Sequence, residues 1–180
     1  MKPAERATRG ISVRPERPED RPAIFDVNRQ AFAQENEARL VEALRESSAF
    51  IPELSLVALE GSRIVGHILF TRITVRDESE AHEALALAPM AVLPEFQKRG
   101  IGSALVRRGL DEARGLGHRA VIVVGHPDYY PRFGFAPARA LGINPPFEVP
   151  SEAFLALELR PGGLSGIRGV VKYPPPFDEV

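Results

Sequence analysis

The sequence predicts a mixed α/β (α+β) fold in one domain, and three observations support this prediction. Segments with the two-residue alternation of strands and segments with a helical repeat follow one another along the chain. A strand at 85–93, a loop with two glycines and a helix at 101–114 stand in direct succession. The short segment 120–124 is wholly apolar, as in a strand that is buried on both faces.

The first half of the chain is expected to supply two helices and three strands. Both helical segments carry apolar residues three or four positions apart, and the first opens with a proline and two acids. A Glu60-Gly61-Ser62 turn joins the last two strands. In chain order, the expected elements are a strand at 11–14, a helix at 18–31, a helix at 35–46, a strand at 54–59 and a strand at 63–75.

The second half is expected to hold the more buried strands. A polar loop at 77–83 precedes the strand at 85–93, and Gly115-Leu116-Gly117 ends the helix at 101–114, as glycines commonly do. No repeat and no long linker divides the chain, so residues 11–180 are predicted to form one domain after a flexible N-terminal tail, 1–10. The remaining expected elements are a strand at 120–124, one or two helical turns at 128–133, and strands at 154–159 and 169–173.

Composition excludes several classes of protein. With 44% hydrophobic and 26% charged residues among 180, the chain is expected to be globular. A net charge of −1 predicts no general attraction to nucleic acid or to an anionic membrane. The absence of cysteine excludes disulfides, cysteine nucleophiles and cysteine metal sites, and we expect no metal. Because no apolar run approaches the roughly 20 residues of a membrane span and no secretory signal is recognised, a cytoplasmic location is expected.

The loop at 94–102 has the composition of a phosphate-binding loop. Its glycines, Gly100 and Gly102, let a ligand approach the backbone, and the first N–H groups of the following helix have no partner within that helix. The spacing disfavours two common phosphate loops, because a Walker loop needs Lys and Ser or Thr after its last glycine and a dinucleotide loop needs a third glycine at Leu105. A tight turn before a helix is the alternative for the isolated tripeptide.

The run Gln97-x-x-Gly100-x-Gly102 resembles the acyl-CoA signature of the GCN5-related N-acetyltransferases (GNAT). The segment from Gly125 to Phe135 is similar to that family's Tyr-x-x-x-Gly-Phe motif, and it resembles the YhbS-like bacterial subgroup in particular. The resemblance covers about 11–173 and implies a central mixed, mostly antiparallel sheet that is splayed where coenzyme A enters and flanked by helices.

The resemblance implies a set of cofactor contacts. The loop and the helix start would hold the pyrophosphate of acetyl-CoA, strand backbone groups would pair with pantetheine, and the tyrosine motif would lie near the thioester. The residues assigned in this way are Met90, Ala91, Val92, Gln97, Lys98, Arg99, Gly100, Ile101, Gly102, Ser103, Tyr130 and Phe133. One apolar face on a short helix predicts core positions for Phe133 and Phe135, and Tyr129 also suits a core position.

The resemblance also implies the catalytic chemistry. Tyr130 matches the tyrosine that protonates the departing thiolate, with a buried structural tyrosine as the alternative. The strand at 85–93 lacks the acid that several relatives use as the base. Glu35, Glu37 and His126 are the remaining candidates, although each also suits a structural role at a helix start or a turn. His67 is predicted to pack within its strand.

The sequence therefore predicts an N-acetyltransferase that moves an acetyl group from acetyl-CoA to a primary amine by direct attack in a ternary complex. A non-catalytic acyl-CoA-binding sensor or interaction domain on the same fold is the alternative, since fold alone does not guarantee activity. The acceptor can be a small molecule or a peptide amine, and the family is compatible with a homodimer. A nucleotide-phosphate enzyme is a weaker third reading, which the loop spacing disfavours.

Overall fold

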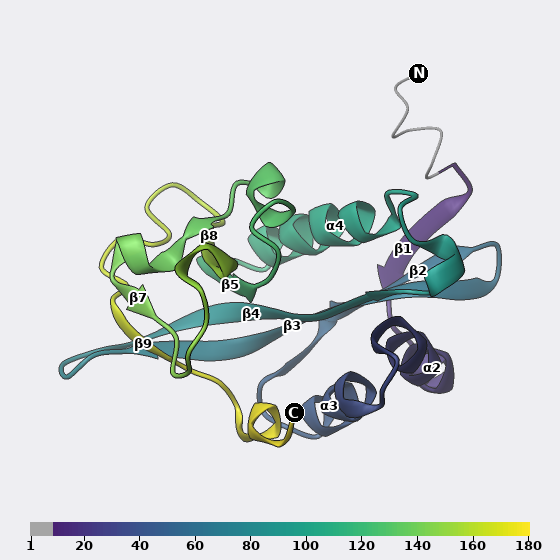
Figure 1. Cartoon of the computed structure of the whole chain (residues 1–180), viewed down its shortest axis with the longest axis horizontal. Coiled ribbons are helices and arrows are strands. Elements are labelled where there is room, and N and C mark those ends of the chain that lie inside the picture. Colours follow the sequence, from purple (N-terminus) through teal and green to yellow (C-terminus); the bar gives the residue numbers. More distant parts are fainter. Residues whose placement is uncertain (1–8) are drawn as a thin grey trace.

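The computed structural model describes residues 9–180, which form one mixed sheet with helices on both faces (Figure 1). The strand order is β1-β2-β3-β4-β5-β8-β6, and β9 pairs with both β3 and β7. Within these residues, only the β4–β5 and β7–β9 pairings are parallel. This confirms the predicted mixed, mostly antiparallel sheet.

The elements have the following bounds. The strands are β1 (Ile11–Pro15), β2 (Phe50–Glu60), β3 (Arg63–Arg76), β4 (Ala81–Val92), β5 (Ala120–Val124), β6 (Ala136–Pro137), β7 (Ile143–Asn144), β8 (Phe154–Glu158) and β9 (Gly169–Lys172). The α-helices are α2 (Arg21–Phe32), α3 (Asn36–Arg45) and α4 (Ile101–Gly115). Short 3-10 helices are η1 (Pro18–Asp20), η2 (Pro94–Phe96), η3 (Tyr130–Phe133), η4 (Ala138–Leu141), η5 (Ser151–Ala153) and η6 (Pro175–Glu179).

The predicted strands and helices are all present, and the differences lie at their ends and in the connections. The segment 77–83 was predicted as a polar loop, but β4 begins at Ala81, because Ala81 and His82 pair with the end of β3. The proline-rich connection 136–151 contains β6, η4 and β7, which no residue pattern predicted. Residues 1–8 of the predicted tail lie outside the described residues, and Arg9 and Gly10 form a turn before β1.

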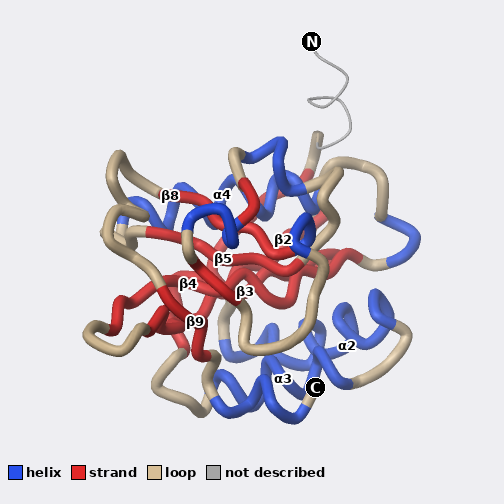
Figure 2. Tube along the Cα trace, turned by 60° about the vertical axis from the view of Figure 1, so that its left-hand side comes forward, coloured by secondary structure: helices blue, strands red, loops and turns tan. Residues whose placement is uncertain are grey.

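The sheet separates two apolar layers (Figures 1 and 2). Helix α4 covers one face, and α2 and α3 cover the other. The alternation of β3 shows this division, because Phe70 belongs to the cluster that includes Leu105 of α4, whereas Leu69 belongs to the cluster that includes Leu44 of α3. Both β3 side chains are fully buried. The close approach of α4 depends on Gly109, where a Cβ atom would lie 2.2 Å from Cε2 of Phe70.

A small polar cluster is buried on the α2 side of the sheet. Nδ2 of Asn28 donates to the Ile24 carbonyl at 3.0 Å and lies 3.2 Å from Nδ1 of His67, so Nδ1 accepts. Nε2 of His67 then carries the proton and donates to Oγ of Ser55 at 2.9 Å. Burial, and to a smaller extent the charge on Arg45, lowers the pKa of His67 to about 3. His67 is thus a neutral, hydrogen-bonded core residue, which agrees with its predicted packing role.

The low pKa of His67 predicts a loss of stability in weak acid. Below about pH 6.5, the His67 side chain binds a proton in the unfolded chain but stays neutral in the folded chain. The free energy of unfolding therefore falls as the pH is lowered, until the pH reaches the folded pKa near 3. Between pH 7 and pH 5 we expect His67 to account for a loss of about 1–2 kcal/mol, measured by urea unfolding at the two pH values. His118, whose pKa burial also lowers, contributes in the same direction.

The variant His67→Gln, which keeps hydrogen-bonding groups but does not titrate, should show a smaller stability difference between pH 7 and pH 5. The matched control is His126→Gln at an exposed position, which should retain the full difference. Equal differences in the two variants would assign the acid sensitivity to other groups.

Candidate functional site

The sheet opens between β4 and β5. These strands pair in parallel only at Leu85 with Val121 and Ala86 with Ile122, although β4 continues to Val92. A register shift in the β3–β4 ladder, between Ile68 and Phe70 of β3, accompanies this divergence. The later residues of β4 therefore present a backbone edge that β5 does not cover. The predicted splay of the sheet is thereby observed.

The direction of this free edge follows from the neighbouring hydrogen bonds. The N–H of Leu93 donates to the Val65 carbonyl of β3 at 2.9 Å, so the backbone groups of Val92 point the other way, into the gap. The side-chain amide of Gln97 donates to the Val92 carbonyl at 3.0 Å, which agrees with that direction. Met90, two residues earlier, presents its backbone to the same side. The edge thus offers donors and acceptors in a strand-like spacing.

The loop after β4 has an unusual backbone conformation. Lys98 has a φ of +62°, which is unusual for a residue with a side chain, and Gly100 has a φ of +82°. Phe96 anchors the loop, because its ring is buried and the guanidinium of Arg99 lies 4.9 Å from its centroid. A backbone fixed in a sparsely populated conformation is typical of a functional loop.

Helix α4 begins without a side-chain cap. The N-cap residue before the helix, Gly100, has no side chain that could cap it, and the first intrahelical bond runs from the Ala104 N–H to the Gly100 carbonyl at 3.1 Å. The N–H groups of Ile101, Gly102 and Ser103 are therefore left at the positive end of the helix dipole. This arrangement suits an anion, in particular a phosphate.

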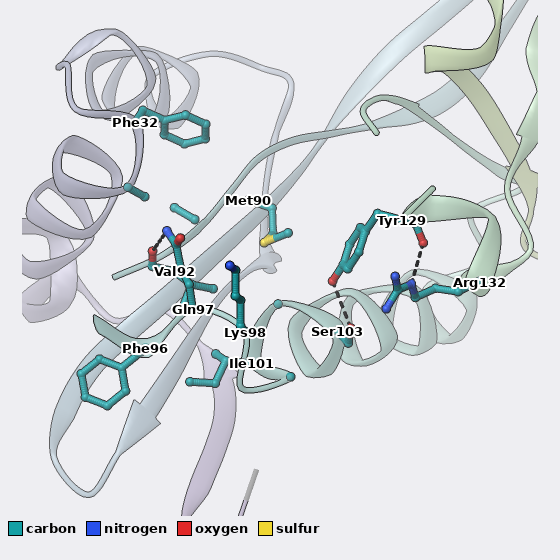
Figure 3. A pocket seen from close by; sticks show the side chains of 14 residues that line it. Phe32, Met90, Val92, Phe96, Gln97, Lys98, Ile101, Ser103, Tyr129 and Arg132 are labelled. Atoms are coloured by element: carbon teal, nitrogen blue, oxygen red, sulfur yellow. Dashed lines mark hydrogen bonds between the residues drawn. The ribbon is translucent and has the colours of Figure 1, made fainter. Parts of the chain in front are cut away.

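The open edge, the loop and the helix start enclose one cavity of about 470 Å³. Figure 3 shows Phe32 and Tyr129 at opposite ends of it, with Met90 between them. The predicted cofactor residues that line the cavity are Met90, Ala91, Val92, Gln97, Lys98, Gly100, Ile101, Gly102 and Ser103. Residues from separate parts of the sequence, 90–92 and 97–103, thus meet at one surface.

The three other predicted cofactor residues lie elsewhere. The side chain of Arg99 turns to Glu60, with its Nη2 3.1 Å from Oε1, and does not line the cavity. Phe133 packs against the core beneath Tyr129 and Tyr130. Tyr130 is 7% exposed and belongs to the apolar core, and burial raises the pKa of its phenol above the usual value.

Tyr129, which the sequence left open as a core aromatic, faces the cavity. Its hydroxyl lies 3.0 Å from Oγ of Ser103 in the first turn of α4 (Figure 3). A Cβ atom at Gly102 would lie 3.2 Å from the same hydroxyl and 3.3 Å from Sδ of Met90. Tyr129 immediately precedes η3, and Tyr130 is the first residue of η3; the side chain of Tyr129 lies at the cavity, whereas that of Tyr130 lies in the core. Which tyrosine acts on a substrate stays a prediction.

The candidate bases do not line this cavity. Oε2 of Glu35 accepts from Nη2 of Arg39 at 2.6 Å, one turn along α3, and Glu37 accepts from Gln34. His126 is exposed, and its carbonyl accepts the N–H of Tyr129 at 3.1 Å in the turn before η3. Each residue thus has the structural position that the sequence allowed as an alternative. Their catalytic roles stay predictions.

The charge on the cavity wall has one sign. Lys98 and Arg132 are its charged lining residues, and no carboxylate or imidazole is among the lining residues that the structure describes. The cavity is therefore suited to an anionic ligand with an apolar portion.

Within 9–180, no group of three or more metal-ligating side chains lies together, and no helix has the length and apolar character that crossing a membrane requires.

Sequence reasoning missed several lining residues, namely Ala31, Phe32, Phe96, Tyr129 and Arg132. Ala31 and Phe32 come from the end of α2, and no local pattern indicates that this helix reaches the end of β4. For Tyr129 and Arg132 a signal existed, because both belong to the tyrosine motif. The motif could not show which of two adjacent tyrosines faces inward, since that depends on the geometry of η3.

Comparisons with known proteins agree with this geometry. Residues 12–138 match the family described as "Acetyltransferase (GNAT) domain". The uncharacterized N-acetyltransferase YjhQ of Escherichia coli K12 is 43% identical over 130 residues, which are 72% of this chain and 72% of YjhQ. The family match spans β1 to the start of η4 and includes the whole cavity.

Two solved structures are similar over nearly the full length. The GNAT family N-acetyltransferase YhbS of Escherichia coli, in complex with CoA, has a TM-score of 0.86 and 31% identity, with 93% of this chain and 92% of that chain covered. A GNAT family acetyltransferase of Brucella melitensis, in complex with acetyl-CoA, has a TM-score of 0.76 and 32% identity, with 93% and 98% covered. The fold, including the opened sheet, is therefore the one those proteins use.

Proposed function

Since the chain belongs to the GNAT acetyltransferase family, we propose that it transfers an acetyl group from acetyl-CoA to a primary amine by direct attack in a ternary complex. The observation that carries the proposal is the convergence on one cavity of the β4 edge, the loop at 97–100 and the first turn of α4. The relatives solved with CoA and acetyl-CoA support the same cosubstrate here.

Each part of the cavity fits one part of acetyl-CoA. The free N–H groups at Ile101, Gly102 and Ser103 suit the pyrophosphate, because amides at a helix start bind anions without a side-chain charge. The backbone groups of Met90 and Val92 suit the two amides of pantetheine, which would pair with β4 as a strand does. The thioester would then lie deeper in the gap between β4 and β5.

The reaction requires a neutral amine, a polarised carbonyl and a proton for the thiolate. The amine nitrogen attacks the thioester carbon, the C–S bond breaks, and the amine loses one proton while the thiolate gains one. At pH 7 an alkyl amine with a pKa of about 10.4 is only about 0.04% neutral, whereas an α-amine with a pKa near 8 is about 10% neutral. Because no carboxylate or imidazole lines the described cavity, amines with the lower pKa are the better acceptors.

The same absence of a base from the cavity lining favours a second candidate, a non-catalytic acyl-CoA-binding domain. Thiol release from acetyl-CoA with a panel of α-amines and alkyl amines separates the two. The protein has no cysteine, so every thiol detected comes from coenzyme A. Amine-dependent release supports the transferase. Saturable binding of acetyl-CoA without release by any amine supports the binding domain, and no binding contradicts both.

The tyrosine pair predicts an unequal response to loss of a hydroxyl. Tyr129→Phe removes the group that faces the cavity, and we expect kcat to fall by about 10- to 100-fold if this hydroxyl protonates the thiolate, which is the low end for general acids. Tyr130→Phe changes a phenol in the core, and we expect a smaller fall in kcat. Rates of thiol release at saturating acetyl-CoA measure both.

If Tyr130→Phe lowered kcat more than Tyr129→Phe did, the proton donor would be Tyr130, as the family motif suggests. Ser103→Ala serves as the control for the tyrosine contact, since it removes the partner of the Tyr129 hydroxyl but leaves the hydroxyl itself. A fall in kcat of equal size in Ser103→Ala and Tyr129→Phe would mean that the contact, rather than the phenol proton, matters.

A further inference from the structure

We propose that Met90 is a site of reversible oxidation, at which conversion of the thioether to the sulfoxide lowers the affinity of the protein for acetyl-CoA. The inference rests on the proposed function, because it concerns the cavity that would hold this cosubstrate. It adds a modification site to that cavity, with hydrogen peroxide as the co-reactant. The Met90 sulfur is oxidised by two electrons and gains an oxygen atom, and the peroxide that supplies this atom is reduced to water.

The sequence offers a peroxide few sulfur atoms to attack. The chain has no cysteine, and its two methionines are Met1 and Met90. Met1 lies outside the described residues. Cysteine and methionine are the side chains whose sulfur is oxidised stepwise by peroxides. Sulfur oxidation within the described part of the chain is therefore confined to Met90, which makes its effect separable from that of other side chains.

The side chain of Met90 is accessible from the cavity. Its backbone is fixed in β4, where Met90 pairs with Ile68 of β3. Its side chain is half-buried, packs against the apolar core and lines the cavity. Figure 3 shows the sulfur atom among the lining side chains, between Phe32 and Tyr129. Because susceptibility to oxidation follows exposure, a small oxidant that enters the cavity can reach this sulfur.

The thioether lies against the start of α4. A Cβ atom at Gly102 would lie 3.3 Å from both Sδ and Cε of Met90, and 3.2 Å from the Tyr129 hydroxyl. The thioether, the hydroxyl and the first turn of α4 therefore meet around Gly102, whose own N–H has no partner within the helix. Thioether sulfur is only a weak acceptor, so the reduced side chain leaves that N–H available for a ligand.

Oxidation changes what this side chain presents to a ligand. The sulfoxide is polar, its oxygen carries partial negative charge and accepts hydrogen bonds, and it occupies space in the cavity. Under the proposed function, the N–H of Gly102 would bind the pyrophosphate and the backbone of Met90 would pair with pantetheine. The new oxygen would compete for the same N–H and lie next to an anion, so the affinity falls. Because methionine sulfoxide reductases restore the thioether, the loss is reversible.

The experiment compares calorimetric titrations of the full chain with acetyl-CoA before and after treatment with hydrogen peroxide, while peptide mass spectrometry measures the sulfoxide at Met90. In the unchanged protein we expect complete oxidation of Met90 to lower the affinity by about 10-fold, the effect of one poorly accommodated polar group. Methionine sulfoxide reductase should then restore it. The matched variant is Met90→Leu, which has a similar volume but no sulfur. Compared with its own untreated sample, Met90→Leu should lose no affinity.

Protection by the ligand gives a second readout. Acetyl-CoA has no free thiol, so it does not consume the peroxide as coenzyme A would. If the Met90 sulfur faces the bound cosubstrate, saturating acetyl-CoA should slow the formation of its sulfoxide, measured against free methionine added to the same sample. Oxidation of Met90 at the same rate with and without bound acetyl-CoA would contradict the placement of this sulfur at the ligand and overturn the inference.

The remaining outcomes separate the inference from the proposed function. If Met90 formed no sulfoxide, or if its sulfoxide left the affinity unchanged, the inference would be overturned and the proposed function would stand. An equal loss of affinity in Met90→Leu would assign the effect to other side chains, and unfolding of the oxidised protein in a thermal scan would assign it to lost structure; either result overturns the inference. Failure of the untreated, folded protein to bind acetyl-CoA would overturn both.

Discussion

Gly102→Glu is expected to abolish acetyl-CoA binding. The substitution places a carboxylate in the first turn of α4, where the free amides would otherwise face a phosphate, and unit charges about 4 Å apart at a partly exposed site repel by about 4 kcal/mol. The side chain is also crowded, because a Cβ atom at this position would lie 3.2 Å from the Tyr129 hydroxyl and 3.3 Å from Met90. We expect a loss of affinity of about 10³-fold, measured by calorimetric titration.

The matched control is Gly115→Glu, which makes the same substitution at the other end of the same helix. A Cβ atom at Gly115 meets nothing within 4 Å, and this position lies outside the cavity. Gly115→Glu should bind acetyl-CoA as the unchanged protein does, and thermal unfolding of both variants would show that α4 is still folded. Retained affinity in a folded Gly102→Glu would contradict the assignment of the loop.

The second large effect is expected at Gly109, on stability. In Gly109→Ala the new methyl group would lie 2.2 Å from Cε2 and 2.6 Å from Cζ of Phe70. Phe70 is fully buried in the cluster that packs α4 against the sheet. Overpacking of this kind costs about 3 kcal/mol, so we expect the free energy of unfolding in urea to fall by about that amount.

The same substitution at Gly115 should raise the free energy of unfolding instead of lowering it. An alanine there meets no atom within 4 Å and improves the helix propensity, so Gly115→Ala should gain up to about 1 kcal/mol. Adding Phe70→Leu to Gly109→Ala removes the ring atoms that collide and should recover part of the loss. If Gly109→Ala alone were as stable as the unchanged protein, the close packing of α4 on β3 would be wrong.

Much of the fold could be predicted because its periodicities are local. The helical repeat of α4 and the apolar composition of β5 each follow from short stretches of sequence, and both elements occur where they were predicted. The polar segment that became the start of β4 shows where local reasoning fails, since Ala81 is a strand residue only because Arg76 of β3 pairs with it. The two-residue strands β6 and β7 exist for the same reason.

As with the fold, only part of the candidate site could be predicted from the sequence. The residues between Gln97 and Ser103 that line the cavity, all but Arg99, could be predicted, because a glycine-containing loop before a helix start has a recognisable pattern. The contributions of Phe32 and Tyr129 could not, because they depend on where α2 ends over the sheet and on how η3 is turned. The family motif contains two neighbouring tyrosines, of which Tyr129 lines the cavity, and the resemblance alone cannot show which of the two faces it.

The uncovered edge of β4 has a consequence for turnover. Under the proposed function, backbone groups of Met90 and Val92 and the first amides of α4 bind parts of coenzyme A that the reaction leaves unchanged. Free coenzyme A therefore makes nearly all the contacts that acetyl-CoA makes, and it leaves the protein no more readily than the cosubstrate does. The ratio of acetyl-CoA to coenzyme A in the surroundings, rather than acetyl-CoA alone, would then set how fast the protein works.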